Sequence, residues 1–445
     1  MRALYLLAIF SFTLSSFAAD KLPRPFPYAH GLAVFADFKT ADYQLTYDVS
    51  QKTVLATAEI NLETHQEGYP VFDSVVDPST ITLDGVRVTA ALVRTPGSET
   101  FLRVIDHNTT PGVHTLRIEL PVKEFFEFSP TGVKHALWMG DLRDRDYLER
   151  FLPANLLFDR VAMSFTVKII GATDTHKIYA NGVVASTQVN EFKVSYPENF
   201  NSSCPFFHLV PVSSVHSLEF SYDSLDGRSI PVVIYMENIG DPVLLEKFKA
   251  GTITIMNELE ADYGAFPHPT LTIYSVPEGG MEYAGATATS LDALGHELFH
   301  SYFARAALPE DGNSGWVDEA LASWRDYGYR TQTTLEGTTN MADHGYYNRV
   351  TDMNAYGFGQ EFFSYLSSKV GDLKPFMKDF VTHRTFAPFG MDEFIAAMNV
   401  FYGMDLTPEF RKFVFKPAPA TVSKSRRQEH PVHKHFTRAQ LIDFL

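Results

Sequence analysis

The sequence predicts a multidomain α+β protein, in which an N-terminal all-β domain is followed by a mainly α-helical domain. Two features of the apolar pattern predict this order. Apolar residues alternate with polar ones over about two hundred residues of the N-terminal part, whereas from about residue 240 they recur at helical spacings. The chain has 445 residues, of which 45% are apolar, so it can bury the cores of two or three domains.

Residues 1–19 have the pattern of a secretory signal peptide. Arg2 precedes an apolar run over residues 3–12, and small residues follow, among them Ala18 and Ala19. A membrane anchor is the alternative, but the run is shorter than the roughly 20 residues that span a bilayer. We therefore expect cleavage near Ala18 or Ala19 and a mature protein that is secreted or periplasmic and holds no membrane segment.

Charge and cysteine content narrow the possible partners. Acidic residues outnumber basic ones by 53 to 37, and the formal charge of −16 argues against a nucleic-acid partner, which needs clustered Lys and Arg. Cys204 is the only cysteine, so no disulfide can form within the chain, and we expect a packed, inert thiol. The oligomeric state is not indicated by the sequence.

Residues 20–235 are predicted to form the β-rich domain. Two runs with period-two alternation are separated by a polar turn and predict paired strands, and Asp84-Gly85 lies between two further runs as a dipeptide suited to a tight hairpin turn. The residues of the first two runs that share a face are Tyr43, Leu45, Tyr47 and Val49, then Ala56, Ala58, Ile60 and Leu62.

Residues 236–416 are predicted to form the mainly helical domain. Apolar residues between Leu244 and Leu259 recur at helical spacings, and the helix should end at Gly264, before the breaker Pro267-His268-Pro269. A short strand beginning at Leu271 and then a series of helices up to Phe413 should follow.

Residues 417–445 form a basic tail with three histidines and no apolar periodicity before a short amphipathic end. A weak metal or anion patch is one interpretation. A solvated linker to a short terminal helix is the preferred one.

The segment His296-Glu297-Leu298-Phe299-His300 contains a pair of candidate metal ligands. Two histidines four residues apart lie on one face of an α-helix, one turn apart, so both can bind one ion. Glu319 lies in a second helix-like run and can supply a third ligand. Two histidines and one glutamate are the ligand set of a catalytic zinc site, in which one coordination position stays open for water.

Glu297 is the candidate general base. It follows His296 directly, so its side chain lies beside the face that holds the ligands. A carboxylate there can take a proton from the attacking water and later pass it to the leaving amine of a peptide. The sequence thus predicts a metal-dependent hydrolase with one Zn²⁺ ion.

These residues resemble the gluzincin metallopeptidases of the aminopeptidase N family, in which HExxH is followed by eighteen residues and a glutamate in a Trp-x-x-Glu context. Trp316 precedes Glu319 with that spacing. The resemblance implies that residues 236–416 form a thermolysin-like zinc peptidase domain. It also implies a short form of the family, without the long C-terminal helical domain of many members.

The segment Gly280-Met281-Glu282-Tyr283 is similar to the family's Gly-x-Met-Glu-Asn motif, with tyrosine in place of asparagine. The resemblance implies that Gly280, Met281 and Glu282 bind the substrate, with Glu282 holding its free α-amino group. A buried carboxylate near the metal would pair with an ammonium group on physical grounds as well. A solvated glutamate on a loop is the alternative interpretation.

Two further roles are implied by the resemblance. Tyr356, in Tyr356-Gly357-Phe358-Gly359, matches the family's Tyr-x-x-Gly segment, whose tyrosine stabilises the oxyanion, and Tyr346 and Tyr347 are the alternatives. Asp326, seven residues after Glu319, matches a carboxylate that orients a zinc-binding histidine. A solvated carboxylate on an exposed helix face is the other interpretation of Asp326.

The predicted function is therefore a secreted zinc aminopeptidase that acts on peptides. An endopeptidase, or an enzyme like the glycyl aminopeptidases, would keep the metal site without the same requirement for a free amino terminus. A catalytically silent peptide-binding module is the alternative from another class, although binding alone does not need three ligands and a base together. The preferred side chain at the cleaved residue is not indicated.

Overall fold

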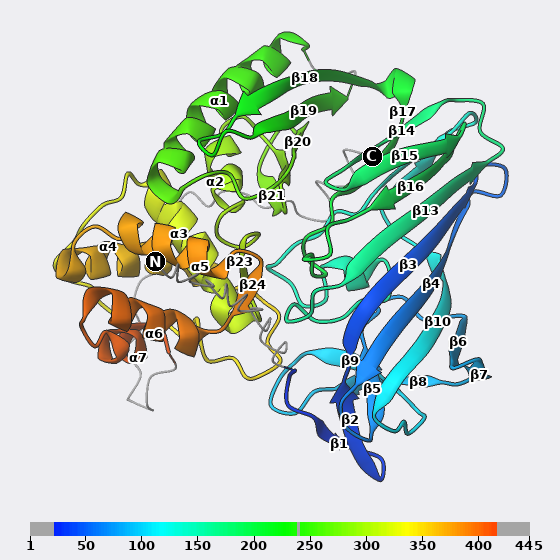
Figure 1. Cartoon of the computed structure of the whole chain (residues 1–445), viewed down its shortest axis with the longest axis horizontal. Coiled ribbons are helices and arrows are strands. Elements are labelled where there is room, and N and C mark those ends of the chain that lie inside the picture. The colour runs from blue at the N-terminus through cyan, green and yellow to red at the C-terminus, as the bar shows by residue number, and fades with distance from the viewer. Residues whose placement is uncertain (1–21, 238–240, 416–445) are drawn as a thin grey trace, which may run out of the picture.

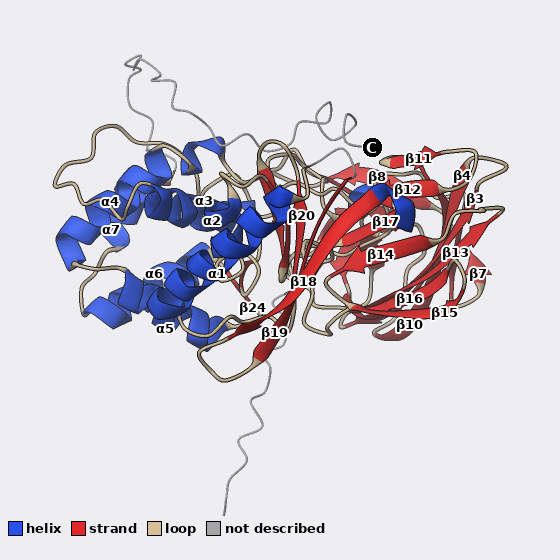
Figure 2. Cartoon of the chain, turned by 90° about the horizontal axis from the view of Figure 1, so that it is seen from above, coloured by secondary structure: helices blue, strands red, loops and turns tan. Residues whose placement is uncertain are grey.

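The computed structural model describes residues 22–237 and 241–415. The predicted signal peptide, residues 1–19, and the predicted tail, residues 417–445, lie outside these ranges. The architecture confirms the predicted α+β class, because helices gather at one end of the molecule and most strands at the other (Figure 2). Among the described residues, we find no helix with the length and apolar character needed to cross a membrane.

An eight-stranded sheet forms the largest part of the N-terminal region (Figure 1). Tyr43 and Leu45 of β3 (Asp37–Asp48) are buried and lie opposite Ala58 and Ala56 of β4 (Thr53–Thr64), so the predicted pairing of these two runs is confirmed. The order of the sheet is β15 (Val183–Gln188), β16 (Glu191–Ser195), β13 (Ala162–Ile170), β3 (Asp37–Asp48), β4 (Thr53–Thr64), β10 (Gly112–Val122), β6 (Thr80–Leu83) and β7 (Val86–Arg87).

The turn between β6 and β7 is the predicted hairpin. Asp84 and Gly85 have φ angles of 51° and 78°, and a tight turn between twisted antiparallel strands needs positive φ at both positions. Glycine adopts such angles without steric cost, and aspartate tolerates them better than most residues.

Two smaller sheets complete the N-terminal region. One contains β1 (Phe26–Tyr28), β2 (Gly31–Phe35), β5 (Tyr69–Phe72), β9 (Phe101–Ile105) and β8 (Ala90–Arg94), and the other contains β11 (Phe126–Phe128), β12 (Val133–Ala136), β17 (Phe207–Pro211) and β14 (His176–Ala180). Two 3-10 turns lie in this region, η1 (Leu148–Arg150) and η2 (Val212–Ser214).

A five-stranded sheet begins the second part of the chain. Its order is β18 (Val215–Asp223), β19 (Ser229–Glu237), β20 (Leu271–Ser275), β22 (Ala286–Thr289) and β21 (Gly280–Tyr283). Since β18 and β19 pair within this sheet, the predicted domain boundary between residues 235 and 236 falls inside β19. β21 is an edge strand, antiparallel to β22.

Helices cover this sheet and build the rest of the second part. α1 (Val243–Tyr263) ends at Gly264, as predicted, and its C-cap glycine has a φ of 100°. The other elements are α2 (Leu294–Phe299), α3 (Gly312–Asp326), η3 (Met353–Ala355), α4 (Phe358–Val370), α5 (Lys374–Arg384), α6 (Met391–Tyr402), α7 (Thr407–Phe413) and a small sheet of β23 (Ala307–Pro309) and β24 (Ala387–Phe389).

The apolar core of the N-terminal region extends into the second part, which also has a core of its own. The cluster that fills the N-terminal region also contains Met281 and Tyr283 of β21, so the edge strand packs directly against the N-terminal region. The hydroxyl of Tyr283 accepts a hydrogen bond from the backbone N–H of Met139 at 3.3 Å. Cys204 is buried in the same cluster, and burial raises the pKa of its thiol, as expected for an inert cysteine.

Candidate active site

α2 and α3 lie next to one another (Figure 1). The predicted ligands are His296 on α2, His300 at its C-cap and Glu319 on α3. Leu294, Leu298 and Phe299 hold α2 in the helical core, which leaves the histidine face turned toward α3. α3 begins at a well-formed N-cap, where the carboxylate of Asp311 accepts a hydrogen bond from the backbone N–H of Ser314 at 3.0 Å.

His296, His300 and Glu319 converge on one point. The Nε2 atoms of His296 and His300 lie 3.0 and 3.4 Å from Oε2 of Glu319, and a donor atom of each residue lies within 4.8 Å of the others. All three side chains are at most 2% exposed. Neutral imidazole and carboxylate are ligands that zinc prefers, so this donor set fits one Zn²⁺ ion with a position left for water.

The electrostatics of the cluster favour a cation. Burial alone would lower the pKa of His300, but the carboxylates of Glu319 and Glu282 outweigh it and raise the pKa to about 9. His296 behaves in the same way, because Asp326 and Glu319 raise its pKa well above the usual value against the effect of burial. The carboxylates therefore stabilise positive charge at the imidazoles, as a bound cation would require.

Asp326 lies behind His296. Its Oδ2 is 2.7 Å from Nδ1 of His296, while its Oδ1 accepts a hydrogen bond from Arg325 at 3.1 Å. Arg325 in turn pairs with Glu258 of α1. A carboxylate on Nδ1 fixes the imidazole so that Nε2 presents its lone pair to a metal.

We expect Asp326→Asn to weaken zinc affinity by about 10–100-fold, because the amide does not hold the imidazole in the metal-binding tautomer as firmly as a carboxylate does. Titration of the metal-free protein with zinc against a competing chelator measures the change. Asp262→Asn, on a half-buried aspartate of α1 outside this cluster, is the matched control. If Asp326→Asn bound zinc with the affinity of the wild type, Asp326 would be only a polar residue on the surface of α3, without a role in orienting His296.

Glu297 is buried beside the ligands and faces β21. A Cβ atom placed on Gly280 would lie 2.2 Å from Oε1 of Glu297, so any side chain at position 280 would displace this carboxylate. Glycine at that position therefore creates the space that Glu297 occupies. Its carboxylate therefore adjoins the edge strand, one residue along the chain from the ligand His296.

Alternation along β21 separates its residues into two groups. Gly280 lies on the face toward Glu297, and Glu282, two residues on, has a carboxylate oxygen within 4.8 Å of donor atoms of His300 and Asp318. The side chain of Met281 is on the opposite face, in the shared core. Any substrate contact of Met281 would therefore come from its main chain, which lies on the edge of the sheet.

Arg305 is the main residue of this region that the motifs do not mark. Its Nη2 donates to Oε1 of Glu282 at 2.7 Å, and its Nη1 donates to the hydroxyl of Ser203 at 2.7 Å. Both charged side chains are almost fully buried. The carboxylate to which the family resemblance gives the substrate amine thus already has an internal partner.

Asp318 and Asp141 complete this buried group. The two carboxyl groups are close enough to interact electrostatically. Burial raises the pKa of Asp318 well above the usual value, and the negative charges of Glu319, Asp141 and Glu282 raise it further. Asp318 could have been suspected because it directly precedes Glu319, but Asp141 comes from the loop after β12 and has no local motif. Both residues are 5% exposed or less.

Of the three candidate tyrosines, Tyr356 lies at the ligands. Its ring stacks with the ring of His296 at 6.2 Å between centroids. Tyr346 is 65% exposed, and the hydroxyl of Tyr347 donates to the backbone oxygen of Arg24, in a separate apolar cluster of the N-terminal region. The geometry therefore favours Tyr356 over both alternatives.

The segment that leads to Tyr356 is fixed to the N-terminal region. Arg349 forms buried ion pairs with Asp73 and with Glu149, and the backbone N–H of Thr351 donates to the carbonyl of Asp141 at 3.0 Å. The N-terminal region thus contributes both to the acidic group and to the placement of the tyrosine.

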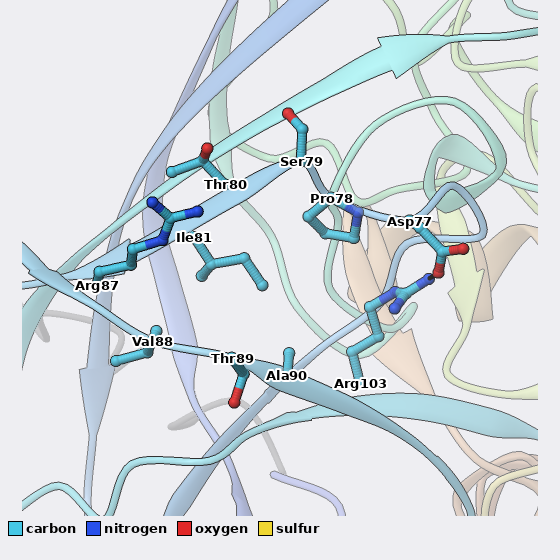
Figure 3. A pocket seen from close by; sticks show the side chains of 10 residues that line it. All are labelled: Asp77, Pro78, Ser79, Thr80, Ile81, Arg87, Val88, Thr89, Ala90 and Arg103. Carbon is cyan, nitrogen blue, oxygen red and sulfur yellow. Dashed lines mark hydrogen bonds and ion pairs between the residues drawn. The ribbon is translucent and has the colours of Figure 1, made fainter.

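A separate pocket lies in the N-terminal region, away from the histidines (Figure 3). It has a volume of about 260 Å³ and lies between β6 and the segment from β7 to β9. Its charged side chains include Asp77 and Arg103, which point toward one another and form an ion pair at 2.8 Å. This pairing satisfies both groups internally, and we assign the pocket no function.

A scan against protein families and a search of curated proteins found no match to the sequence. The fold is nevertheless similar to solved zinc metallopeptidases. An M1 zinc metallopeptidase from Deinococcus radiodurans has a TM-score of 0.63 at 14% identity, over 86% of this chain and 95% of that one. Another structure of that enzyme, in mutant form, is described as bound to a Tyr-Ser-Ala substrate, with a TM-score of 0.63 at 13% identity over 86% of this chain and 95% of that one.

Larger proteins show the same fold in part. Native yeast LTA4 hydrolase has a TM-score of 0.63 at 13% identity, over 87% of this chain and 69% of that one. Legionella pneumophila aminopeptidase A, solved with aspartic acid, has a TM-score of 0.64 at 13% identity, over 85% of this chain and 49% of that one. The chain thus has the fold of M1 zinc metallopeptidases, and at these identities the comparison establishes the fold alone.

Proposed function

We propose that this protein is an exported zinc aminopeptidase that hydrolyses the first peptide bond of peptides. One observation carries the proposal, namely the convergence of His296, His300 and Glu319 with the buried carboxylate of Glu297 beside them. The similarity in fold to M1 zinc metallopeptidases supports the same reaction class. The exported location rests on the signal pattern of residues 1–19.

Different residues of the chain have different roles in the proposed hydrolysis. A zinc ion at the three ligands would lower the pKa of a water molecule and polarise the substrate carbonyl. Glu297 takes the proton from the water as the oxygen attacks the carbonyl carbon, and then donates it to the leaving amine. Gly280 keeps the space for this carboxylate open.

Glu282 supports the assignment as an aminopeptidase. Its carboxylate is buried, and one of its oxygens lies within 4.8 Å of a ring nitrogen of His300. It can therefore pair with the α-ammonium group of a peptide whose first carbonyl lies at the zinc position. An endopeptidase is the second candidate: if the ion pair with Arg305 only neutralises Glu282, that carboxylate holds no substrate amine.

The deciding experiment compares a peptide with a free amino terminus and the same peptide acetylated at that terminus. Cleavage of the free peptide alone, abolished by a chelator and restored by zinc, supports the aminopeptidase. Cleavage of both peptides supports the endopeptidase. If neither is cut across a varied peptide pool, while peptides still bind, the protein is a silent peptide-binding module.

We expect Tyr356→Phe to lower kcat by about a hundredfold with little change in KM, because the phenol would donate a hydrogen bond to the oxyanion that develops during attack. Steady-state kinetics with the free peptide measure both constants. Tyr346→Phe is the matched control, since its side chain is exposed and its hydroxyl accepts a hydrogen bond from Arg24. A Tyr356→Phe enzyme with unchanged kcat would remove this tyrosine from the mechanism.

A further inference from the structure

We propose that Arg305 is a positioning residue that fixes the carboxylate of Glu282 and thereby sets the preference for substrates with a free amino terminus. The inference rests on the proposed function, because it concerns how the same site selects its substrate. It assigns a specificity-determining role to a residue that lies outside the metal-binding and substrate-binding motifs.

The first step of the argument is the geometry of the pair. Arg305 uses three donors in this region: Nη2 donates to Oε1 of Glu282 at 2.7 Å, Nε donates to the backbone carbonyl of Glu282 at 3.4 Å, and Nη1 donates to Ser203 at 2.7 Å. A planar guanidinium held at three points cannot rotate freely. The orientation of the Glu282 carboxylate is therefore fixed from one side.

The second step concerns the other oxygen of the carboxylate. Oε2 of Glu282 is buried and has no hydrogen-bond partner among the described residues. A buried, unpaired acceptor costs free energy unless a donor satisfies it, and a charged donor does so best. Because a carboxylate oxygen of Glu282 lies within 4.8 Å of donor atoms of His300 and Asp318, the carboxylate that carries this acceptor adjoins the proposed metal ligands.

The third step is the sign of the local charge. Asp141, Glu282 and Asp318 are buried near Arg305, so three acidic side chains share one arginine outside the proposed metal ligands. The excess of acidic groups favours the binding of a further cation at this position. The ammonium group of a peptide carries a positive charge and three N–H donors, one of which can donate to Oε2.

Without Arg305, Glu282 would be a buried carboxylate next to two others and without its hydrogen-bonded arginine. Such a group is costly, so it takes up a proton or turns away. Either response removes the fixed, charged acceptor. We therefore expect the loss of Arg305 to weaken binding of the amine and to leave binding at the zinc position unaffected.

Two small zinc-binding probes test this expectation on the zinc-loaded mature chain. Alanine hydroxamate has a free amine, and N-acetylalanine hydroxamate is the same molecule with that amine blocked. Calorimetry gives the affinity for each, and the ratio of the two affinities isolates the contribution of the amine. We expect the wild-type protein to prefer the free amine by at least about tenfold, as a charge-assisted hydrogen bond would give.

In Arg305→Gln, we expect the preference to fall below about threefold, while the affinity for the acetylated probe stays within about twofold of wild type. Arg305→Lys should be intermediate, because it restores the charge without the planar fork. With free-amine peptides, the Gln variant should raise KM and leave kcat largely unchanged. Arg103→Gln, which removes another buried arginine of an ion pair, is the matched control.

Ser203→Ala keeps the test informative if Arg305→Gln fails to fold. It removes one anchor of the guanidinium and leaves both charges in place, so the preference should fall by about two- to fivefold. A preference that rises in Arg305→Gln overturns the proposal, since Arg305 would then only neutralise Glu282. A wild-type preference near one also overturns it, even if Glu297-dependent hydrolysis persists. Failure of both probes to bind overturns the proposed function as well.

Discussion

Replacement of Glu297 by glutamine is expected to lower kcat for peptide hydrolysis by about a thousandfold. The amide has nearly the shape of the carboxylate but cannot accept the proton of the attacking water. Glu297 does not belong to the three converging ligands, so the variant should still bind zinc with the affinity of the wild type. Steady-state kinetics and metal content per chain measure the two effects separately.

The matched control is Glu246→Gln, an equivalent change on the exposed surface of α1. It should behave as the wild-type protein in both assays. If Glu297→Gln retained more than about a tenth of the wild-type kcat, another group would have to act as the base, and the proposed division of roles would be wrong. Loss of zinc in this variant would instead point to a structural disturbance of the ligands.

Replacement of Glu319 by alanine is expected to abolish both stable zinc binding and hydrolysis. The variant removes one of three ligands, so the loss of zinc affinity should exceed the roughly 10–100-fold expected from a residue that only orients a ligand, such as Asp326. Zinc should also no longer raise the free energy of unfolding of this variant. In the wild-type protein, zinc at a hundred times its Kd should add about 2.7 kcal/mol to the free energy of unfolding, and in the variant this gain should disappear.

The matched control for Glu319→Ala is Asp318→Asn, one residue earlier on α3. Glu282, His300 and Asp318 form a second group whose donor atoms lie within 4.8 Å of one another, and this group shares His300 with the predicted site. If zinc bound to Glu319→Ala with wild-type affinity and was lost in Asp318→Asn, the second group would be the metal site. Thermal unfolding with and without zinc distinguishes the two outcomes.

Local periodicity was enough to predict several elements. The pairing of β3 with β4, the turn at Asp84 and Gly85 and the end of α1 at Gly264 all follow from side chains within a few residues of one another. The convergence of His296 and His300 has the same origin, because four residues make about one helical turn and place both imidazoles on one face.

Periodicity could not predict which elements meet. The alternation in β18 and β19 predicts strands, but it does not say that they pair with β20 rather than with the N-terminal sheets. The predicted boundary at residue 235 divided one sheet for this reason. The choice among the three candidate tyrosines also depended on tertiary structure. The loop before Tyr356 is fixed to the N-terminal region by Arg349, and its course brings Tyr356 to His296.

Most of the proposed metal site could therefore be predicted from the sequence, since the two histidines and Glu297 are neighbours on one helical turn and only Glu319 comes from another helix. The tertiary structure alone decided the surroundings of Glu282. Arg305 is 23 residues away along the chain, and Ser203 and Asp141 come from loops of the N-terminal region. Contacts between residues so far apart along the chain depend on how sheets and helices pack, and a short-range pattern of residues cannot predict them.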